Sequence, residues 1–277
     1  MCCADYNKYS ILMSVYYKEK PEWLDISIQS MLNQTVKADE FVIVKDGKLT
    51  KELDDVISNY AEQYPQLFNI IELEKNEGLG PALNAGIRQC RNELVARMDS
   101  DDYSCDKRCE KQLKFFKNNP DYDIVGTYEV EFEDHITNKI SIHKVSETSD
   151  EIYEKMKRRC SLLHPTVMYK KSSVLKCGGY KKVHLYEDYD LFMRMVVERK
   201  MKSYNIQENL YYIRINDDFY KRRGGIKYMK TVVAFKYKQM KKGYMSLCDF
   251  IVSAGGQAFV CLLPNTLRKA FYMKFLR

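Results

Sequence analysis

The first half of the chain alternates short apolar runs with segments that carry an apolar stripe. Runs rich in β-forming residues lie at residues 9–17, 40–47, 68–74 and 93–98. Apolar residues recur at helical spacing in the segment that Pro21 begins, in residues 50–60, and after the glycine-rich loop that opens residues 75–90. Strands that alternate with helices indicate βαβ units, so this half predicts a mostly parallel, Rossmann-like sheet flanked by helices.

The second half is less regular and predicts a small antiparallel element within the α/β fold. Residues 122–134 alternate between apolar and polar positions, and we expect them to form a hairpin with residues 139–145. The other predicted elements are a helix at 149–160 with Ser149 as its N-cap, a strand at 164–170, and a glycine loop that enters a helix at 177–198.

The end of the chain is basic and predicts a helical extension over residues 219–277. The formal net charge is +7, and Lys and Arg crowd residues 221–277. Such a tail suits nucleic acid, an anionic membrane or an anionic substrate, or is a solvated face. Residues 247–264 are apolar but too short and too often interrupted for a transmembrane helix. We expect this run either to lie in a membrane interface or to pack as a helical cap.

Chain length and cysteine usage indicate the number of domains and the cellular compartment. A chain of 277 residues suits one large α/β domain, or a domain with an appendage. Its nine cysteines include no CxxC pair, which is typical of a reducing compartment. The first ten residues lack the basic and apolar pattern of a signal peptide. These features predict a cytoplasmic protein.

Polar residues follow four of the predicted strands. Ligands of parallel α/β sheets bind outside the carboxyl ends of the strands. The residues in that position are Tyr16 and Tyr17, Asp46, the 76–80 loop, and Asp99 to Asp102. They come from separate strands, so the sheet itself is expected to gather them into one site.

Three carboxylates in four residues, Asp99, Asp101 and Asp102, repel one another unless a cation or donor groups neutralise them. A calcium loop would need glycine where Ser104 stands, and it would follow a helix rather than a strand. A Mg²⁺ or Mn²⁺ site needs only one or two carboxylates, completed by substrate phosphates and water. Asp102 is either a second ligand or a helix-capping residue.

An ordered set of motifs carries a family resemblance over residues 9–214. The motifs are SVYYKEKPEWLDISIQSMLNQT, FVIVKDG, NEGLGPALNAGI, ARMDSDD, HPTVMY, GGYKKVHLYEDYDLFMR and LYYIR. In this order they resemble the family 2 glycosyltransferases of the GT-A fold, inverting sugar-nucleotide transferases that build bacterial surface polysaccharides. The resemblance implies a catalytic domain over residues 1–218, with a nucleotide-binding half at about 9–103 and an acceptor-binding half at about 104–218.

For the nucleotide half, the resemblance implies contacts with the base, the ribose, the diphosphate and a divalent metal, Mn²⁺ or Mg²⁺. The base would lie against Ser14, Tyr16 and Asp46, the ribose and diphosphate against Asn84, Arg97 and Asp99, and the metal on Asp99 and Asp101. Lys45 stands where the family usually has a further Asp.

For the acceptor half, the resemblance implies that Asp188 is the base that deprotonates the acceptor hydroxyl. Glu187, His164 and Gly179 would lie beside the sugars, and Arg214 matches an Arg that follows the last core strand. Asn216 replaces a His that the family commonly carries there. Arg222 and Arg223 either grip the diphosphate or belong to a surface basic run.

The sequence therefore predicts a metal-dependent inverting transferase. It would move a hexose or N-acetylhexosamine from a UDP-sugar to an oligosaccharide, expected to be lipid-linked, at the inner face of the plasma membrane and without nucleic acid. One alternative is a sugar-nucleotide nucleotidyltransferase, which would need a glycine-rich loop after the first strand. The other is a catalytically degenerate scaffold subunit, for which only Lys45 and Asn216 speak.

Overall fold

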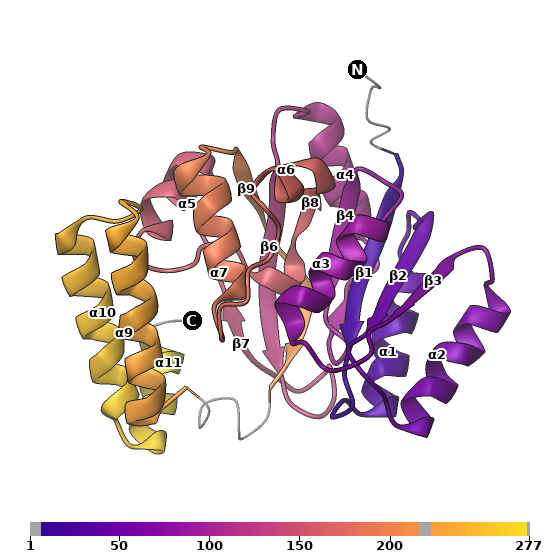
Figure 1. The fold of residues 1–277 in the computed structure, drawn as a ribbon, viewed down its shortest axis with the longest axis horizontal. Helices are drawn as coiled ribbons and strands as arrows, with labels where there is room; N and C mark the ends of the chain where they lie inside the picture. The colour runs from indigo at the N-terminus through magenta and orange to yellow at the C-terminus, as the bar shows by residue number, and fades with distance from the viewer. Residues whose placement is uncertain (1–6, 216–222, 276–277) are drawn as a thin grey trace.

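A mixed sheet of nine strands runs through the part of the chain that the computed structural model describes, residues 7–215 and 223–275 (Figure 1). The strands are β1 (Tyr9–Val15), β2 (Glu40–Lys45), β3 (Phe68–Glu72), β4 (Leu94–Met98), β5 (Tyr103–Ser104), β6 (Ile124–Phe132), β7 (Lys139–His143), β8 (Met168–Lys170) and β9 (Ser203–Arg214). Their order is β3-β2-β1-β4-β8-β6-β9-β5, and β7 pairs with β6 beside this path. β1 pairs in parallel with β2 and β4, and β2 with β3, which confirms the predicted parallel half.

The other half of the sheet mixes directions. β8 runs antiparallel to both β4 and β6, and β7 forms the predicted hairpin with β6. β9 pairs in parallel with β6 along its length and also holds the short β5. This last pairing matters for the site, because β9 lies against the loop that follows β4.

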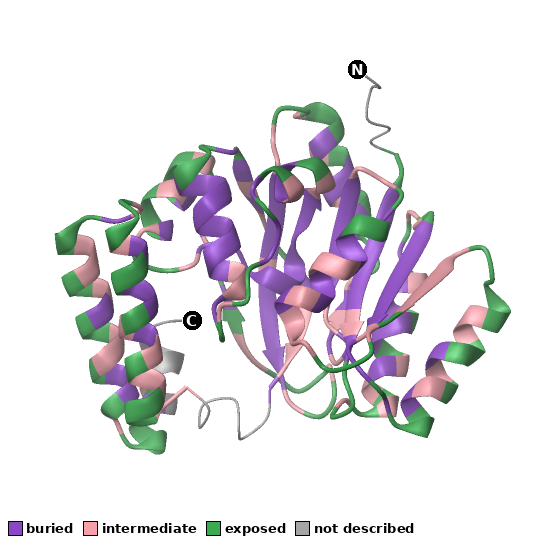
Figure 2. Cartoon of the chain, viewed as in Figure 1, coloured by how far each residue is buried: buried purple, intermediate pink, exposed green. Residues whose placement is uncertain are grey.

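Helices cover both faces of the sheet. They are α1 (Pro21–Leu32), α2 (Lys51–Gln63), α3 (Leu79–Gln89), α4 (Arg108–Asn118), α5 (Ser149–Met156), α6 (Lys171–Lys176), α7 (Glu187–Phe192), α9 (Gly225–Lys241), α10 (Leu247–Leu262) and α11 (Asn265–Phe275), with the short helices η1 (His164–Thr166) and η2 (Met193–Glu198). Side chains alternate along β1: Ile11 and Met13 pack with α1, α2 and α4, whereas Leu12 packs with α3 and α7. Figure 2 shows the strands buried between these layers.

Two local predictions were wrong. Residues 164–166 form the 3₁₀ helix η1 rather than a strand, because Pro165 lacks the N–H that a strand ladder needs. Thr148, not Ser149, caps α5, in a reciprocal capping box with Glu151. The prediction for residues 177–198 is confirmed: the glycine loop leads into a helix, which begins at Glu187 as α7 and continues as η2.

The C-terminal helices dock on the acceptor half. Phe235 of α9 stacks on Tyr186, with ring centroids 4.4 Å apart. The buried carboxylate of Asp190 accepts hydrogen bonds from Lys242 Nζ at 3.0 Å and Gln239 Nε2 at 3.1 Å. Among the described residues, no helix is long and apolar enough to cross a bilayer. On one side of α10 the side chains of Ala254, Val260 and Cys261 are buried, so this side packs on the protein. The other side of the helix is exposed (Figure 2).

Candidate active site

The acidic loop after β4 begins with a buried cation. The Arg97 side chain is fully buried, and its guanidinium pairs with the carboxylate of Asp99. The Asp99 side chain stays about one-third exposed (32%), so it also reaches solvent. Burial, together with the charge of Asp99, raises the pKa of Asp101 to about 6. Asp99 and Asp101 are thus neighbouring carboxylates, both partly exposed, and the charge of Asp99 disfavours the ionised form of Asp101.

Asp102 is turned into the protein. One of its oxygens accepts from the Tyr211 hydroxyl at 2.9 Å, and the other from the Arg214 backbone N–H at 2.7 Å. Burial, followed by the charges of Asp101 and Asp99, raises its pKa well above the usual range. Arg214 also donates from Nε to the Asp101 carbonyl oxygen at 2.9 Å. Asp102 and Arg214 therefore fix the loop to β9, which leaves Asp99 and Asp101 as the carboxylates that the predicted metal could use.

These two carboxylates fit a divalent cation whose other ligands are phosphates and water. Hard cations take oxygen ligands, and Mg²⁺ sites of this kind use one or two carboxylates. Among the described residues, no group of three or more His, Cys, Asp or Glu side chains is placed to hold a metal. The arrangement suits a metal that is held jointly with a diphosphate, rather than one that the protein holds alone.

The residues predicted for the base lie at the ends of β1 and β2. Ser14 is half-buried within β1, and Tyr16, just beyond the strand, is exposed. The carboxylate of Asp46 accepts from the backbone N–H of Glu77 at 2.7 Å and of Gly78 at 3.0 Å, so it holds the glycine-rich loop. The predicted contact between Asp46 and a base remains a proposal.

Lys45, the departure from the family pattern, has a structural explanation. Its ammonium group pairs with Asp54 of α2 at 2.7 Å and with Glu72 of β3 at 2.6 Å. The side chain therefore ties β2 to its neighbours on the outer side of the sheet. An Asp at this position would face two carboxylates instead.

Asn84 and Gly179 meet across the two halves. The Asn84 amide accepts from the Tyr180 N–H at 2.7 Å and donates to the Tyr180 carbonyl oxygen. Gly179 has a φ of +66°, and a Cβ there would lie 2.3 Å from Asn84 Oδ1. Only glycine fits this turn. Asn84, predicted to bind ribose or diphosphate, therefore positions the glycine loop.

Glu187 and Asp188 open α7 beside the start of α3. A Cβ at Gly80 would lie 3.4 Å from Glu187 Cβ. Burial raises the pKa of Glu187 to about 7 and also raises that of Asp188. The Asp188 carboxylate accepts from the Tyr189 N–H at 2.7 Å. For both carboxyls, the charge of Arg97 lowers the pKa and that of Asp99 raises it, so all four groups share one electrostatic site.

His164 is part of the same buried region and lines the pocket that also contains Asp188. Its Nε2 lies 3.0 Å from the Tyr180 hydroxyl, which holds the imidazole against the glycine loop. Burial, with the charge of Arg97, lowers its pKa well below the usual value, so the ring is neutral.

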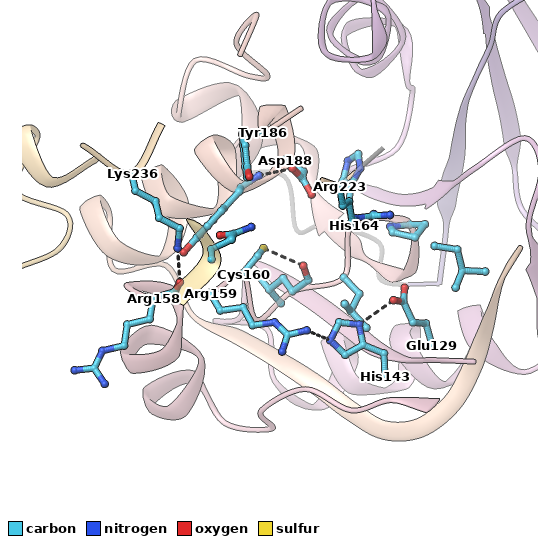
Figure 3. Close-up of a pocket in the computed structure, with 16 residues that line it drawn as sticks. Glu129, His143, Arg158, Arg159, Cys160, His164, Tyr186, Asp188, Arg223 and Lys236 are labelled. Carbon is cyan, nitrogen blue, oxygen red and sulfur yellow. Dashed lines mark hydrogen bonds and ion pairs between the residues drawn. The ribbon is translucent and has the colours of Figure 1, made fainter. Parts of the chain in front are cut away.

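A pocket of about 290 Å³ opens on Asp188 (Figure 3). Its polar lining includes Asp188, His164, Arg159, Arg223 and Lys236. Arg223 thus lies beside the predicted base, while Arg222 and Asn216 fall outside the described residues. Sequence reasoning missed Arg159 and Lys236, because each looked like one cation in a basic run. It also missed Tyr211, which the LYYIR motif contains but does not single out.

The model of glycosyl transferase family 2 matches residues 10–183. The chain is 38% identical over 275 residues to UDP-Gal:alpha-D-GlcNAc-diphosphoundecaprenol beta-1,3-galactosyltransferase of Escherichia coli, covering 99% of this chain and 98% of that protein. It is 35% identical over 226 residues to the amylovoran biosynthesis glycosyltransferase AmsE of Erwinia amylovora, covering 81% and 83%.

Two solved structures share the fold. S. aureus TarS 1–349 aligns with a TM-score of 0.63 at 17% identity, over 97% of this chain and 75% of that one. The mannosyltransferase PcManGT from Pyrobaculum calidifontis, in complex with GDP-Man and Mn²⁺, aligns with a TM-score of 0.62 at 14% identity, over 95% and 78%. At such identities the likeness concerns the fold alone, and it confirms the predicted GT-A architecture.

Proposed function

The chain belongs to glycosyl transferase family 2, as a glycosyltransferase of bacterial polysaccharide biosynthesis, and we propose that it transfers galactose from UDP-galactose to a lipid-linked sugar with inversion. The relative from Escherichia coli, similar over nearly the full length of both chains, supports this choice of donor and acceptor. Within the molecule, the observation that carries the proposal is the position of Arg97 between the acidic loop and Asp188. It pairs with Asp99 and acts electrostatically on Asp188, so the two halves form one site.

The chemistry follows from these positions. The acceptor hydroxyl attacks the anomeric carbon of galactose while Asp188 takes its proton, and the bond from that carbon to the diphosphate breaks, leaving UDP. A divalent metal on Asp99 and Asp101 would neutralise the charge that develops on the diphosphate. Ser14, Tyr16 and Asp46 would hold the base, and Glu187 and Gly179 would lie beside the sugars.

We place the enzyme at the inner face of the plasma membrane, as a peripheral protein. Five exposed apolar residues lie on α10: Leu247, Ile251, Val252, Phe259 and Leu262. At 100° per residue they fall within an arc of about 140°, which makes one apolar face. The surrounding segment is rich in Lys and Arg, which suits anionic lipid headgroups.

The test combines nucleotide binding with transfer. Thermal unfolding should show stabilisation by UDP that requires Mn²⁺, with little effect of GDP; a ligand at 100 times its Kd stabilises by about 2.7 kcal/mol. Wild-type enzyme should transfer galactose from UDP-galactose to a GlcNAc-diphosphate lipid and form a β linkage. Asp188→Asn should lower kcat about 10²- to 10⁴-fold and leave UDP stabilisation unchanged.

The outcomes separate the alternatives. A wild-type rate for Asp188→Asn would remove the assigned base. Stabilisation by UDP with no transfer to any acceptor would favour the scaffold subunit. Formation of UDP-galactose from a sugar phosphate and UTP would indicate a nucleotidyltransferase.

A further inference from the structure

The pocket that opens on Asp188 adjoins a second one beneath the C-terminal helices. The second pocket has a volume of about 280 Å³. The two share Arg158, Arg159, Lys236 and Gln257 among their lining residues. The first contains the catalytic carboxylate, and the second is lined by Gly256, Val260 and Phe271 from α10 and α11. The combined space therefore leads from a polar catalytic end, past a group of cations, to an apolar end.

Lys236 lies at the junction of the two pockets, and its buried ammonium group has no ion-pair partner in the part of the chain that the structure describes. Its side chain is 2% exposed, and its Nζ donates to the Arg158 carbonyl oxygen at 2.7 Å (Figure 3). Within residues 7–215 and 223–275, no carboxylate lies within 4.0 Å of this ammonium group. Burial, with the charge of Arg159, lowers its pKa to about 8. A buried charge without an ion-pair partner costs stability, so its presence points to a ligand that brings the opposite charge.

Neighbouring cations have their own anchors and are held in place. Arg159 is within 3.0 Å of His143 Nε2, and His143 Nδ1 lies 2.9 Å from the Glu129 carboxylate (Figure 3). Arg158 forms a salt bridge with Asp249 of α10, with its Nε 2.6 Å from the carboxylate. The pocket wall thus presents Arg159 from a fixed position beside Lys236, a geometry suited to phosphate oxygens.

We propose that Lys236 and Arg159 bind the diphosphate of the lipid-linked acceptor, with its sugar toward Asp188 and its hydrocarbon chain toward Val260 and Phe271. This inference rests on the proposed function. It places the acceptor diphosphate apart from the donor diphosphate, which the metal site at Asp99 and Asp101 would hold. It also explains why α9 and α10 pack beside the base: they complete the acceptor site.

Farnesyl diphosphate is a suitable probe, because it carries the diphosphate and a prenyl chain but no sugar. Its binding to the full-length protein is measured by calorimetry, with and without UDP and Mn²⁺. Lys236→Met should raise its Kd about 10- to 150-fold, the loss of one charged hydrogen bond. Lys236→Arg should restore most of the affinity. Lys238→Met, at an exposed position of the same helix, is the matched control and should change nothing.

Steady-state kinetics give a second measurement. Lys236→Met should raise KM for a GlcNAc-diphosphate lipid at little cost in kcat, and should leave KM unchanged for the same lipid glycoside without phosphate. The variant is expected to fold, since it removes a buried charge rather than creating one. Urea unfolding checks that its stability is not below that of the wild type.

Each outcome decides the inference. Farnesyl diphosphate that competes with UDP would occupy the donor site and would overturn the proposal. Equal affinity for wild type and Lys236→Met, or an equal rise of KM for both acceptors, would overturn it too. Transfer to the lipid acceptor without any farnesyl diphosphate binding would refute the subsite and leave the proposed function standing. Binding that depends on Lys236, in an enzyme that transfers no sugar, would support the subsite and refute the function.

Discussion

Single replacements of Asp101 and Asp102 with alanine test whether Asp101 binds the metal while Asp102 supports the structure. The two residues are adjacent in the chain, yet among the described residues only the Asp102 carboxylate accepts hydrogen bonds from β9, through Tyr211 and Arg214, whereas Asp101 accepts from Arg214 with its backbone oxygen. Asp101 instead lies near Asp99. Burial, and to a smaller extent the charge of Asp99, raises the pKa of Asp101 to about 6. The two substitutions should therefore have opposite consequences.

The magnitudes follow from these contacts. Asp102→Ala leaves the Tyr211 hydroxyl and the Arg214 N–H without their acceptor, and each buried donor without a partner costs about 1–3 kcal/mol. The sum is about 2–6 kcal/mol. For a chain of this size each kcal/mol shifts Tm by about 2–4 °C, so the mid-range loss corresponds to roughly 10 °C. Asp101→Ala relieves repulsion with Asp99, so its Tm should equal or exceed that of the wild type.

Differential scanning fluorimetry and urea unfolding measure stability, and calorimetry measures UDP binding with and without Mn²⁺. Asp101→Ala should lose the Mn²⁺-dependent part of UDP binding at full stability. Asp102→Ala should lose stability and, where it remains folded, keep the Mn²⁺ dependence. Two variants of equal Tm, or an Asp101→Ala protein that still binds UDP in a Mn²⁺-dependent way, would refute the assignment of the register.

Two further predictions concern pH and lipid. The folded protein holds the Glu187 proton more tightly than the unfolded chain does, because its pKa is raised to about 7; stability should therefore fall as pH rises from about 4.5 to 7. Glu187→Gln should flatten this slope in urea unfolding, and an unchanged slope contradicts the raised pKa. Ile251→Lys with Phe259→Lys should reduce co-sedimentation with phosphatidylglycerol vesicles several-fold, relative to the control Asn59→Lys on the exposed side of α2. Equal sedimentation of all variants would place the membrane contact elsewhere.

The nucleotide half could be predicted because its physics is local. Buried parallel strands are continuous apolar runs, and the runs at residues 9–17 and 40–47 became β1 and β2 with their polar residues at the carboxyl ends. Asp46 and Asp99 were found by that rule alone, before any resemblance. The packing that turned Asp102 inward was not local: Tyr211 and Arg214 lie more than 100 residues further along the chain.

The acceptor half depends on such distant pairings. β9 pairs in parallel with β6, and its mixed polar and aromatic sequence shows neither this partner nor the direction of the pairing. Lys236 lies on a helix with many lysines, and this one is buried where α9 packs near Arg158 and against α10. A basic run read along the chain cannot show which of its charges will lose contact with water.

Arg97 shows why the two halves cannot be treated as independent. Its guanidinium is fully buried, and among the described residues its Nε and Nη1 groups have no hydrogen-bond partner. A buried cation in this state acts on every carboxylate around it: it pairs with Asp99 and lowers the pKa of Asp188, which burial raises. A base must be ionised to take a proton, so the proposed base Asp188 depends on its backbone hydrogen bonds and also on the charge that pairs with Asp99. A change of charge at the proposed diphosphate site should therefore also shift the pKa of the proposed base.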